Sequence, residues 1–320
     1  MSNHPLVTLA IPTYNRAASY LPIALHSALK QNYPELEILV SDNASTDHTR
    51  ALIAGIKDPR LRYFRHESNI GQKGNYNFCI EQAKGSYLLL LHDDDAIDED
   101  FVRSCMEATW GASNVGIIRT GMRLIDADGK IIREIMNTVG GLSLGEFFRG
   151  WFALKTPIYC CNTLFNTQKL RETGGFESKH FCYPDTMAIF RLAAQGSRID
   201  VREIKASFRI HGGEAGASRK IAEWCEDSLE LLRFMCDLAP ESRDQIWQEG
   251  RRFFSKANYG RASRADAPWQ RVIAIAKVMS YFNFRQLPSR HVILQIVYGT
   301  RLYHTLRLLK RSLNTPFPRA

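Results

Sequence analysis

The feature that most constrains the fold is the leucine run at residues 88–91, which leads through His92 into three aspartates at 93–95. A continuous apolar run is typical of a central strand buried on both faces of a sheet. Carboxylates directly after such a strand lose hydration and repel one another, which is costly unless a cation lies among them. The run therefore predicts a ligand site that holds Mg²⁺ or Mn²⁺. The alternative is an acidic turn, which fits residues 98–100 better because these can cap a helix that begins near Phe101.

Strand-like and helix-like segments alternate through the first part of the chain. Short β-branched or apolar runs predict strands at residues 7–11, 37–40, 61–65 and 87–91. Helical spacing or capping residues predict helices at residues 17–31, after 42–47, and at 76–83. Such alternation predicts an α/β fold, in which a mostly parallel central sheet has helices on both faces.

The later part of the chain follows other patterns. Residues 115–208 are less regular and contain a possible hairpin at residues 126–129. From about Lys220 the pattern becomes helical and basic. We therefore expect an α/β domain at residues 1–216 and a helical, basic region at residues 217–320.

Composition narrows the classes of protein. The seven cysteines are odd in number and include no C-x-x-C pair, which argues against a disulfide framework and a structural zinc site. The net charge of +9 suits a substrate that carries a diphosphate, and no nucleic-acid-binding motif is found. The beginning of the chain lacks the pattern of a signal peptide, and the apolar runs are too short for a spanning helix. We expect a cytoplasmic protein that does not bind nucleic acid.

Four motifs then make the interpretation specific. They are Ile-Pro-Thr-Tyr-Asn-Arg at 11–16, Ser-Asp-Asn-Ala-Ser-Thr-Asp at 41–47, Asn-Ile-Gly-Gln-Lys-Gly-Asn-Tyr-Asn at 69–77, and the aspartates at 93–95. In this order they resemble the family 2 glycosyltransferases, which have the GT-A fold, over about residues 7–211. The third motif is similar to that of enzymes that build bacterial surface polysaccharides.

The resemblance implies a role for each motif residue. Those that would bind the nucleotide sugar are Pro12, Thr13, Tyr14, Arg16, Asp42, Asn43, Lys73, Asp93 and Asp94. Within this set, Asp42 would face the base, Lys73 the diphosphate and Asp93 the ribose, and Asp95 would bind the metal. Asp94 is left open between metal ligand and support. Purely structural roles also stay open for some of these residues. Asp42 and Asn43 could cap a helix, Tyr14 could pack in the core, and Lys73 could be a solvated surface lysine.

The resemblance also places a catalytic base after a Gly-Gly-Phe segment, here residues 174–176. Asp185 matches that position, at the start of a helix-like segment over 187–195. Its neighbour Pro184 departs from the acidic residue that the family often has there, and Asp185 could instead cap the helix. Glu177 is the fallback candidate.

Two late residues complete the candidate site. By resemblance His211 could bind the metal as a neutral ligand and Arg209 could clamp a phosphate. A lone histidine is more often structural. Trp151 and Tyr159 are candidates for the acceptor side.

The expected function is sugar transfer, with inversion, from a nucleotide sugar to a glycan or lipid-linked saccharide acceptor. One alternative is a nucleotidyltransferase, which should carry a Gly-rich phosphate loop where this chain has residues 12–15. Another is a binding protein that has lost its chemistry. UDP, dTDP and CDP sugars all stay possible as donors.

The end of the chain predicts contact with a membrane surface. The apolar residues 291–298 lead into residues 301–311, where the leucines at 302, 306 and 309 share one side of a helix and most basic residues lie elsewhere. We expect residues 290–313 to bind anionic lipid peripherally, at the inner face of the cytoplasmic membrane. The protein should float with anionic liposomes at low salt and be released at high salt. If a version truncated before Ser289 behaves like the full chain, these leucines instead pack on the protein.

Overall fold

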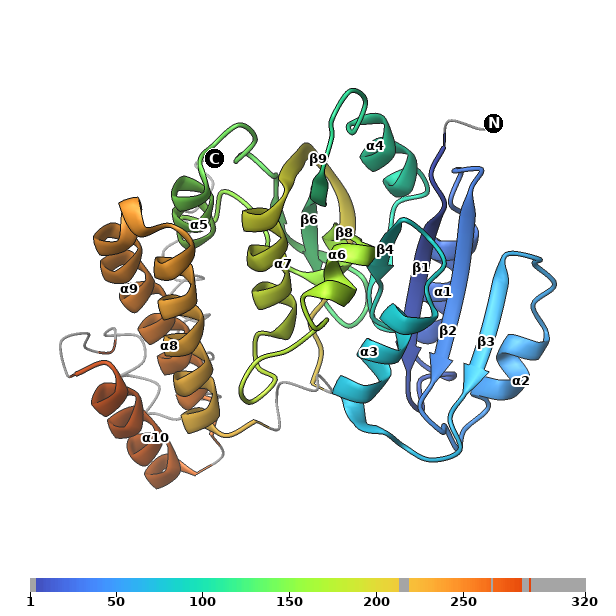
Figure 1. Ribbon diagram of the computed structural model, residues 1–320. Coiled ribbons are helices and arrows are strands. Elements are labelled where there is room, and N and C mark those ends of the chain that lie inside the picture. The colour runs from blue at the N-terminus through green and yellow to red at the C-terminus, as the bar shows by residue number, and fades with distance from the viewer. Residues whose placement is uncertain (1–3, 213–218, 266, 284–287, 289–320) are drawn as a thin grey trace, which may run out of the picture.

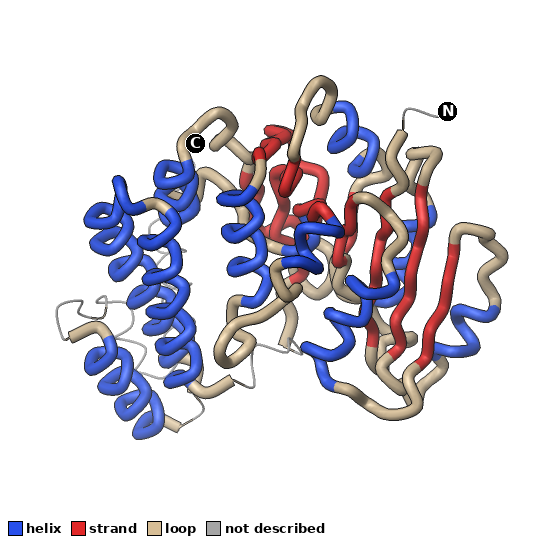
Figure 2. Tube along the Cα trace, viewed as in Figure 1, coloured by secondary structure: helices blue, strands red, loops and turns tan. Residues whose placement is uncertain are grey.

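The computed structural model describes residues 4–212, 219–265, 267–283 and 288. A central sheet has helices on both faces, and a group of helices lies beyond one edge of this layer (Figures 1 and 2). The strands are β1 (Val7–Thr13), β2 (Leu36–Asp42), β3 (Leu61–Arg65), β4 (Tyr87–Leu90), β5 (Ala96–Ile97), β6 (Val115–Ile125), β7 (Ile131–Ile135), β8 (Thr163–Asn166) and β9 (Ser197–Arg209).

The sheet has a parallel half and a mixed half. Its order is β3-β2-β1-β4-β8-β6-β9-β5, with β7 paired to β6. The strands β3, β2, β1 and β4 are all parallel, as the alternation of segments predicts. Beyond β4 the neighbours β8 and β6 pair antiparallel, and β6 and β9 pair parallel. The α/β class is confirmed, but the sheet is mixed rather than mostly parallel because β8 returns beside β4 in the opposite direction.

The predicted hairpin and helices are present with shifted bounds. β6 and β7 form the hairpin around residues 126–129. The helices are α1 (Leu21–Leu29), α2 (Thr49–Ala54), α3 (Gly71–Gln82), α4 (Phe101–Glu107), α5 (Leu144–Phe152), α6 (Thr167–Glu172), α7 (Pro184–Gln195), α8 (Ile221–Leu238), α9 (Arg243–Ala262) and α10 (Pro268–Tyr281), with short 3-10 turns η1 (Cys160–Asn162) and η3 (Pro240–Ser242). α3 begins before its expected start at Tyr76 because Asn43 and Asn69 accept hydrogen bonds from the first backbone N–H groups.

Two hydrophobic cores cover the two faces of the sheet. Leu89 and Leu91 point into the core formed with α1 and α4, whereas Leu88 and Leu90 point into the core formed with α3, α6 and α7. All four leucines have no exposed surface. The prediction that this run is a central strand buried on both faces is therefore confirmed.

The core under α7 continues into the helices that follow the sheet. Phe190 of α7 contacts the rings of Phe147, Phe148 and Trp151 of α5. α5 packs on α9, and α7 packs on α8, so the sheet layer and the helical region share one core. The expected boundary at residue 216 and the membrane-binding segment 290–313 lie outside the described residues. Within the described part of the chain, no helix is both long enough and apolar enough to span a bilayer.

The shared core generates a stability prediction. Phe190→Ala should lower the free energy of unfolding by about 3–5 kcal/mol, because it removes a fully buried ring and leaves a cavity. Urea unfolding should stay a single transition, since both parts of the chain pack on this ring. Ile23→Ala, at a position that is 45% exposed in α1, is the control and should change stability by about 0.5 kcal/mol or less. Two separate transitions in the wild-type protein would contradict the shared core.

Candidate active site

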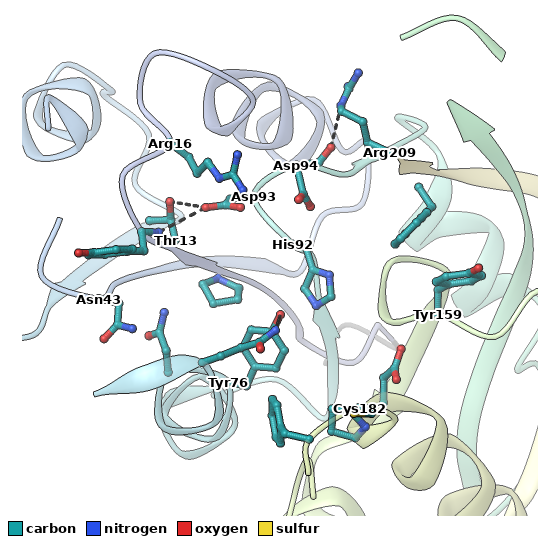
Figure 3. A pocket seen from close by; sticks show the side chains of 18 of the residues that line it. Thr13, Arg16, Asn43, Tyr76, His92, Asp93, Asp94, Tyr159, Cys182 and Arg209 are labelled. Carbon is teal, nitrogen blue, oxygen red and sulfur yellow. Dashed lines mark hydrogen bonds between the residues drawn. The ribbon is translucent and has the colours of Figure 1, made fainter. Parts of the chain in front are cut away.

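A cavity of about 470 Å³ opens where β1 and β4 end and where α3 and α7 begin (Figure 3). Its lining residues come from segments far apart in the sequence. They are Pro12, Thr13, Tyr14, Arg16, Asn43, Asn69, Gln72, Asn75, Tyr76, His92, Asp93, Asp94, Tyr159, Phe181, Cys182, Pro184, Asp185, Phe208, Arg209, Arg219 and Trp224. Of the residues that the sequence nominates for the site, those that do not line the cavity are Asp42, Lys73, Asp95, Trp151, Glu177 and His211.

Asp93 is fixed at the end of β4 by the loop that follows β1. Its Oδ2 accepts hydrogen bonds from Thr13 Oγ1 at 2.7 Å and from the Tyr14 backbone N–H at 3.4 Å. Burial and the neighbouring Asp94 raise the pKa of Asp93 to about 7. A ligand that donates hydrogen bonds or carries positive charge would therefore stabilise the ionised form of Asp93.

The loops after β1 and β2 are hydrogen-bonded to each other. Asn15 has a positive φ of 55°, its backbone N–H donates to Ser45 Oγ at 2.9 Å, and its side-chain oxygen accepts from the Thr46 N–H at 2.8 Å. These contacts bring Asn43 to the cavity with the first loop. The side chain of Tyr14 is 45% exposed, so it is not packed in the core.

Asp42 has no exposed surface. One of its oxygens accepts from the Ser45 N–H at 2.8 Å, and the other accepts from the Tyr63 hydroxyl at 2.6 Å. Both oxygens are thus used inside the protein. Asp42 holds the turn after β2, and its neighbour Asn43 is the residue that faces the cavity.

Lys73 forms an ion pair with Glu177, and both side chains are about half exposed. Lys73, nominated to contact the diphosphate, and Glu177, the fallback candidate for the base, therefore neutralise each other's charge.

The Gly-Gly-Phe segment at residues 174–176 is joined to α3, because the Phe176 N–H donates to Asn77 Oδ1 at 2.9 Å. A Cβ atom at Gly175, where φ is 72°, would come within 2.3 Å of the same oxygen.

Three residues near the end of β4 have the spacing of a metal site. One ligand atom each from His92, Asp94 and Asp95 lies within 4.8 Å of the others. Asp95 is 1% exposed, and its Oδ2 has no hydrogen-bond partner within the described residues. Burial first, and Asp94 second, raise the pKa of Asp95 well above its usual range. A cation here would offset both effects, so these residues fit a divalent metal.

His92 is the metal-site residue that reasoning from the sequence left out. Its Nδ1 lies 3.8 Å from Asp95 Oδ2, and its ring stacks on Tyr76 at 5.1 Å between centroids. Its position in the sequence, between the buried strand and the aspartates, could have indicated it. A residue directly after a buried strand lies at the same sheet edge as the aspartates that follow it.

His211 and Arg209 support the aspartates from the end of β9. The His211 Nε2 lies 2.9 Å from Asp94 Oδ2. The Arg209 backbone N–H donates to Asp95 Oδ1, and its Nε donates to the Asp94 carbonyl, both at 2.9 Å. His211 is thus next to one member of the cluster and outside the cavity lining, whereas Arg209 reaches the cavity.

Asp185 lies in the first turn of α7, directly after Pro184. A proline is well suited to the first position of a helix, because its missing N–H would have no partner there. One Asp185 oxygen accepts from the Thr186 N–H at 2.8 Å. Burial raises the pKa of Asp185. A carboxyl group in a cavity with a raised pKa has the properties of a general base.

Aromatic and basic residues also line the cavity. Tyr159 and Phe208 contact each other with ring centroids 4.4 Å apart, and Arg219 and Trp224 come from the helical region. Trp151 lies in the shared core and does not line the cavity. The sequence did not indicate Arg219 or Trp224, because they follow the recognisable motifs.

The metal site generates a binding prediction. Purified protein should bind Mn²⁺, and Asp95→Asn should weaken this binding at least about tenfold, because a neutral amide replaces a buried ligand of similar shape. Titration of free Mn²⁺ by electron paramagnetic resonance measures it. Asp128→Asn, at an exposed position in the hairpin turn, is the control. Equal Mn²⁺ affinity of the two variants would contradict the site.

The chain was compared with known proteins. The model for glycosyl transferase family 2 matches residues 8–171, just over half of the chain. The succinoglycan biosynthesis protein ExoO of Rhizobium meliloti is 33% identical over 129 residues, which are 40% of this chain and 36% of that protein. The GalNAc(5)-diNAcBac-PP-undecaprenol beta-1,3-glucosyltransferase of Campylobacter jejuni is 31% identical over 134 residues, 41% of this chain and 42% of that protein. The matches thus span less than half of either relative.

Solved structures show the same fold. Residues 1–349 of TarS from S. aureus superpose with a TM-score of 0.62 at 17% identity, over 98% of this chain and 93% of that one. The mannosyltransferase PcManGT from Pyrobaculum calidifontis, solved with GDP-Man and Mn²⁺, has a TM-score of 0.58 at 18% identity, over 97% of this chain and 85% of that one. The fold and the matched motifs lead to one conclusion: the chain belongs to glycosyl transferase family 2.

Proposed function

We propose that the protein transfers a sugar from a nucleotide-sugar donor to an acceptor hydroxyl, with inversion, in the synthesis of a bacterial surface polysaccharide. One observation carries this proposal. Asp185, whose pKa is raised, lines the same cavity as His92 and Asp94, and these two form a metal-type cluster with Asp95, which has a buried oxygen without a partner among the described residues.

The donor's nucleoside would lie against the loops after β1 and β2. Pro12, Thr13, Tyr14, Arg16 and Asn43 supply the contacts there. Other side chains act around them: Asp93, held by Thr13, would accept hydrogen bonds from a ribose, and Asp42 keeps the second loop in position. Lys73 would have to leave Glu177 to reach a diphosphate.

The donor's diphosphate would lie at the cluster of His92, Asp94 and Asp95. These residues would hold Mg²⁺ or Mn²⁺, with Asp95 as a ligand, and the metal would supply positive charge to the departing diphosphate. His211 is left either to complete the ligand set or to orient Asp94, from which it lies 2.9 Å. The bound Mn²⁺ of PcManGT supports a metal at this fold's site.

Asp185 would act as the base. It takes the proton of the acceptor hydroxyl while that oxygen forms a bond to the anomeric carbon and the bond to the diphosphate oxygen breaks. A single displacement of this kind inverts the configuration of the anomeric carbon. The base must be ionised, so its raised pKa places the acid limit of activity above the usual aspartate range.

Two alternatives are less well supported. A nucleotidyltransferase would need a Gly-rich phosphate loop after β1, where this chain has Pro12 and Thr13. A binding protein without chemistry has no need of a buried, raised-pKa carboxyl group at the cavity. Release of a nucleoside diphosphate supports transfer, whereas release of pyrophosphate supports the nucleotidyltransferase.

The acceptor proposal is a glycan or lipid-linked saccharide. The C. jejuni relative, which is named for an undecaprenol-linked saccharide, supports it. We also propose peripheral contact of the protein with the inner face of the cytoplasmic membrane through residues 290–313, which the liposome experiment tests. The donor can be identified by screening nucleotide sugars against the purified protein. The screen includes UDP, dTDP and CDP sugars, and also GDP-mannose because PcManGT was solved with it.

The base assignment generates a kinetic prediction. Asp185→Asn should bind the donor with near-normal affinity but transfer sugar about a hundredfold or more slowly, because the proton acceptor is lost. The wild-type rate should fall as the pH drops through the raised pKa of Asp185, and this acid limb should be absent from the variant's residual activity. Glu177→Gln is the matched control and should keep the wild-type rate. A normal rate in Asp185→Asn would make Glu177 the better candidate, and full activity in a chelator would contradict the metal.

A further inference from the structure

Helix α8 of the C-terminal helical region holds the loop that precedes Asp185. Asp227 of α8 is 2% exposed and accepts three hydrogen bonds from this loop. The Ser178 hydroxyl and the Cys182 N–H donate to one oxygen at 2.8 and 2.9 Å, and the His180 N–H donates to the other at 2.9 Å. Hydrogen bonds to a buried carboxylate are stronger than neutral ones. Asp227 therefore fixes the backbone of residues 178–182.

The neighbouring Glu226 strengthens the same connection from the surface. Lys179 Nζ donates to it at 2.7 Å, and His180 Nε2 lies 2.8 Å away. The Tyr281 hydroxyl of α10 donates to its other oxygen at 2.9 Å. Two consecutive acids of α8 thus bind the loop, and one of them also joins it to α10.

The loop conformation has consequences in the cavity. Phe181 has a φ of 58°, which is unfavourable for a bulky residue and persists only where surrounding contacts require it. Its ring lies 5.9 Å from Tyr76, which in turn stacks on His92. Phe181 lines the cavity and Asp185 follows four residues later. A change in the loop would therefore move both the cavity wall and the base.

α8 also reaches the cavity directly. Trp224 lies about one helical turn before Asp227 and lines the same cavity as Asp185. Its ring is held in place by the Arg261 guanidinium at 3.8 Å and by an edge contact with Tyr183 at 5.3 Å. A fixed aromatic surface in the same cavity as a proton acceptor suits the apolar face of a sugar ring whose hydroxyl must reach that acceptor.

We propose that α8 builds the acceptor subsite of this cavity. Trp224 is the wall against which a pyranose ring of the acceptor packs. Asp227 is a positioning residue, which holds the loop 178–182 and through it Asp185. This inference rests on the proposed function, because it assigns the acceptor side of the same reaction.

The test of Asp227 needs no acceptor, because water takes its place when the donor is hydrolysed. The measurement is release of nucleoside diphosphate from the nucleotide sugar selected in a screen of UDP, dTDP, CDP and GDP sugars. Asp227→Asn should lower kcat by up to about a hundredfold, since a small misplacement of a reacting group costs this much, and should leave the donor KM within about twofold.

Two controls separate positioning from general destabilisation. Asp237→Asn changes the same residue type at an exposed position of the same helix. Leu232→Ala removes buried side-chain atoms of α8 that lie against Gly250 of α9. Both should keep kcat. The positioning role is wrong if Asp227→Asn keeps kcat as Asp237→Asn does, or if Leu232→Ala loses as much kcat for the same drop in Tm.

The test of Trp224 uses p-nitrophenyl glycosides of glucose, galactose, N-acetylglucosamine and glucuronic acid as acceptors. Trp224→Ala should raise the acceptor KM about fivefold to tenfold, and by a larger factor than the donor KM. Trp269→Ala, at a position 63% exposed in α10, is the control and should change neither. Equal acceptor KM values in the two variants would contradict the proposal that the acceptor sugar packs against Trp224.

The outcomes for the wild-type protein distinguish a failure of the acceptor subsite from a failure of the proposed function. Hydrolysis of a donor without transfer to any of the four pyranosides would contradict the acceptor subsite and leave the proposed function standing. Release of nucleoside diphosphate from none of the sugars would contradict the proposed function, and the subsite would be lost with it.

Discussion

The structure depends on the cost of holding carboxylates at the end of a strand that has no exposed face. β4 has a neighbouring strand on each side and a hydrophobic core above and below it. Asp95 is therefore almost fully buried and Asp93 reaches only the cavity, and burial raises the pKa of both. The surrounding residues reduce this cost only in part, because Asp95 keeps one oxygen without a partner in the described chain. A cation is the group that would remove the remainder.

Residues from distant parts of the chain hold these carboxylates. Thr13 from the end of β1 donates to Asp93, and the backbone of Arg209 from the end of β9 donates to Asp95. His211 lies against Asp94. The mixed half of the sheet explains how this is possible. β9 runs parallel to β6, so its carboxyl end arrives beside the cluster after more than a hundred residues of chain.

The helical region is packed so closely on the sheet layer that it takes part in the site. Phe190 joins α7 to α5, and Asp227 joins α8 to the loop before α7. α7 is thus fixed along its length by apolar contacts and at its beginning by hydrogen bonds. A general base needs this kind of support, since its rate contribution depends on placement within a fraction of an ångström.

The sequence by itself determined what depends on local pattern. The parallel strands over residues 7–91 and the hairpin at 126–129 follow from apolar runs and turn residues, and the structure contains them. The motif order indicated the family and pointed to loop residues such as Thr13 and Asn43, which do line the cavity. Asp185 also lines it, although its role stays a prediction.

Tertiary structure decided what depends on contacts between distant segments. The mixed half of the sheet arises because β8 inserts between β4 and β6. No local sequence pattern predicts this insertion. The interior hydrogen bonds of Asp42 and the ion pair of Lys73 with Glu177 likewise require partners that only folding brings near. Trp224 reaches the cavity, and Asp227 reaches the loop before α7, for the same reason. Periodicity predicts that their segment is a helix, but only packing decides which face of that helix meets the cavity.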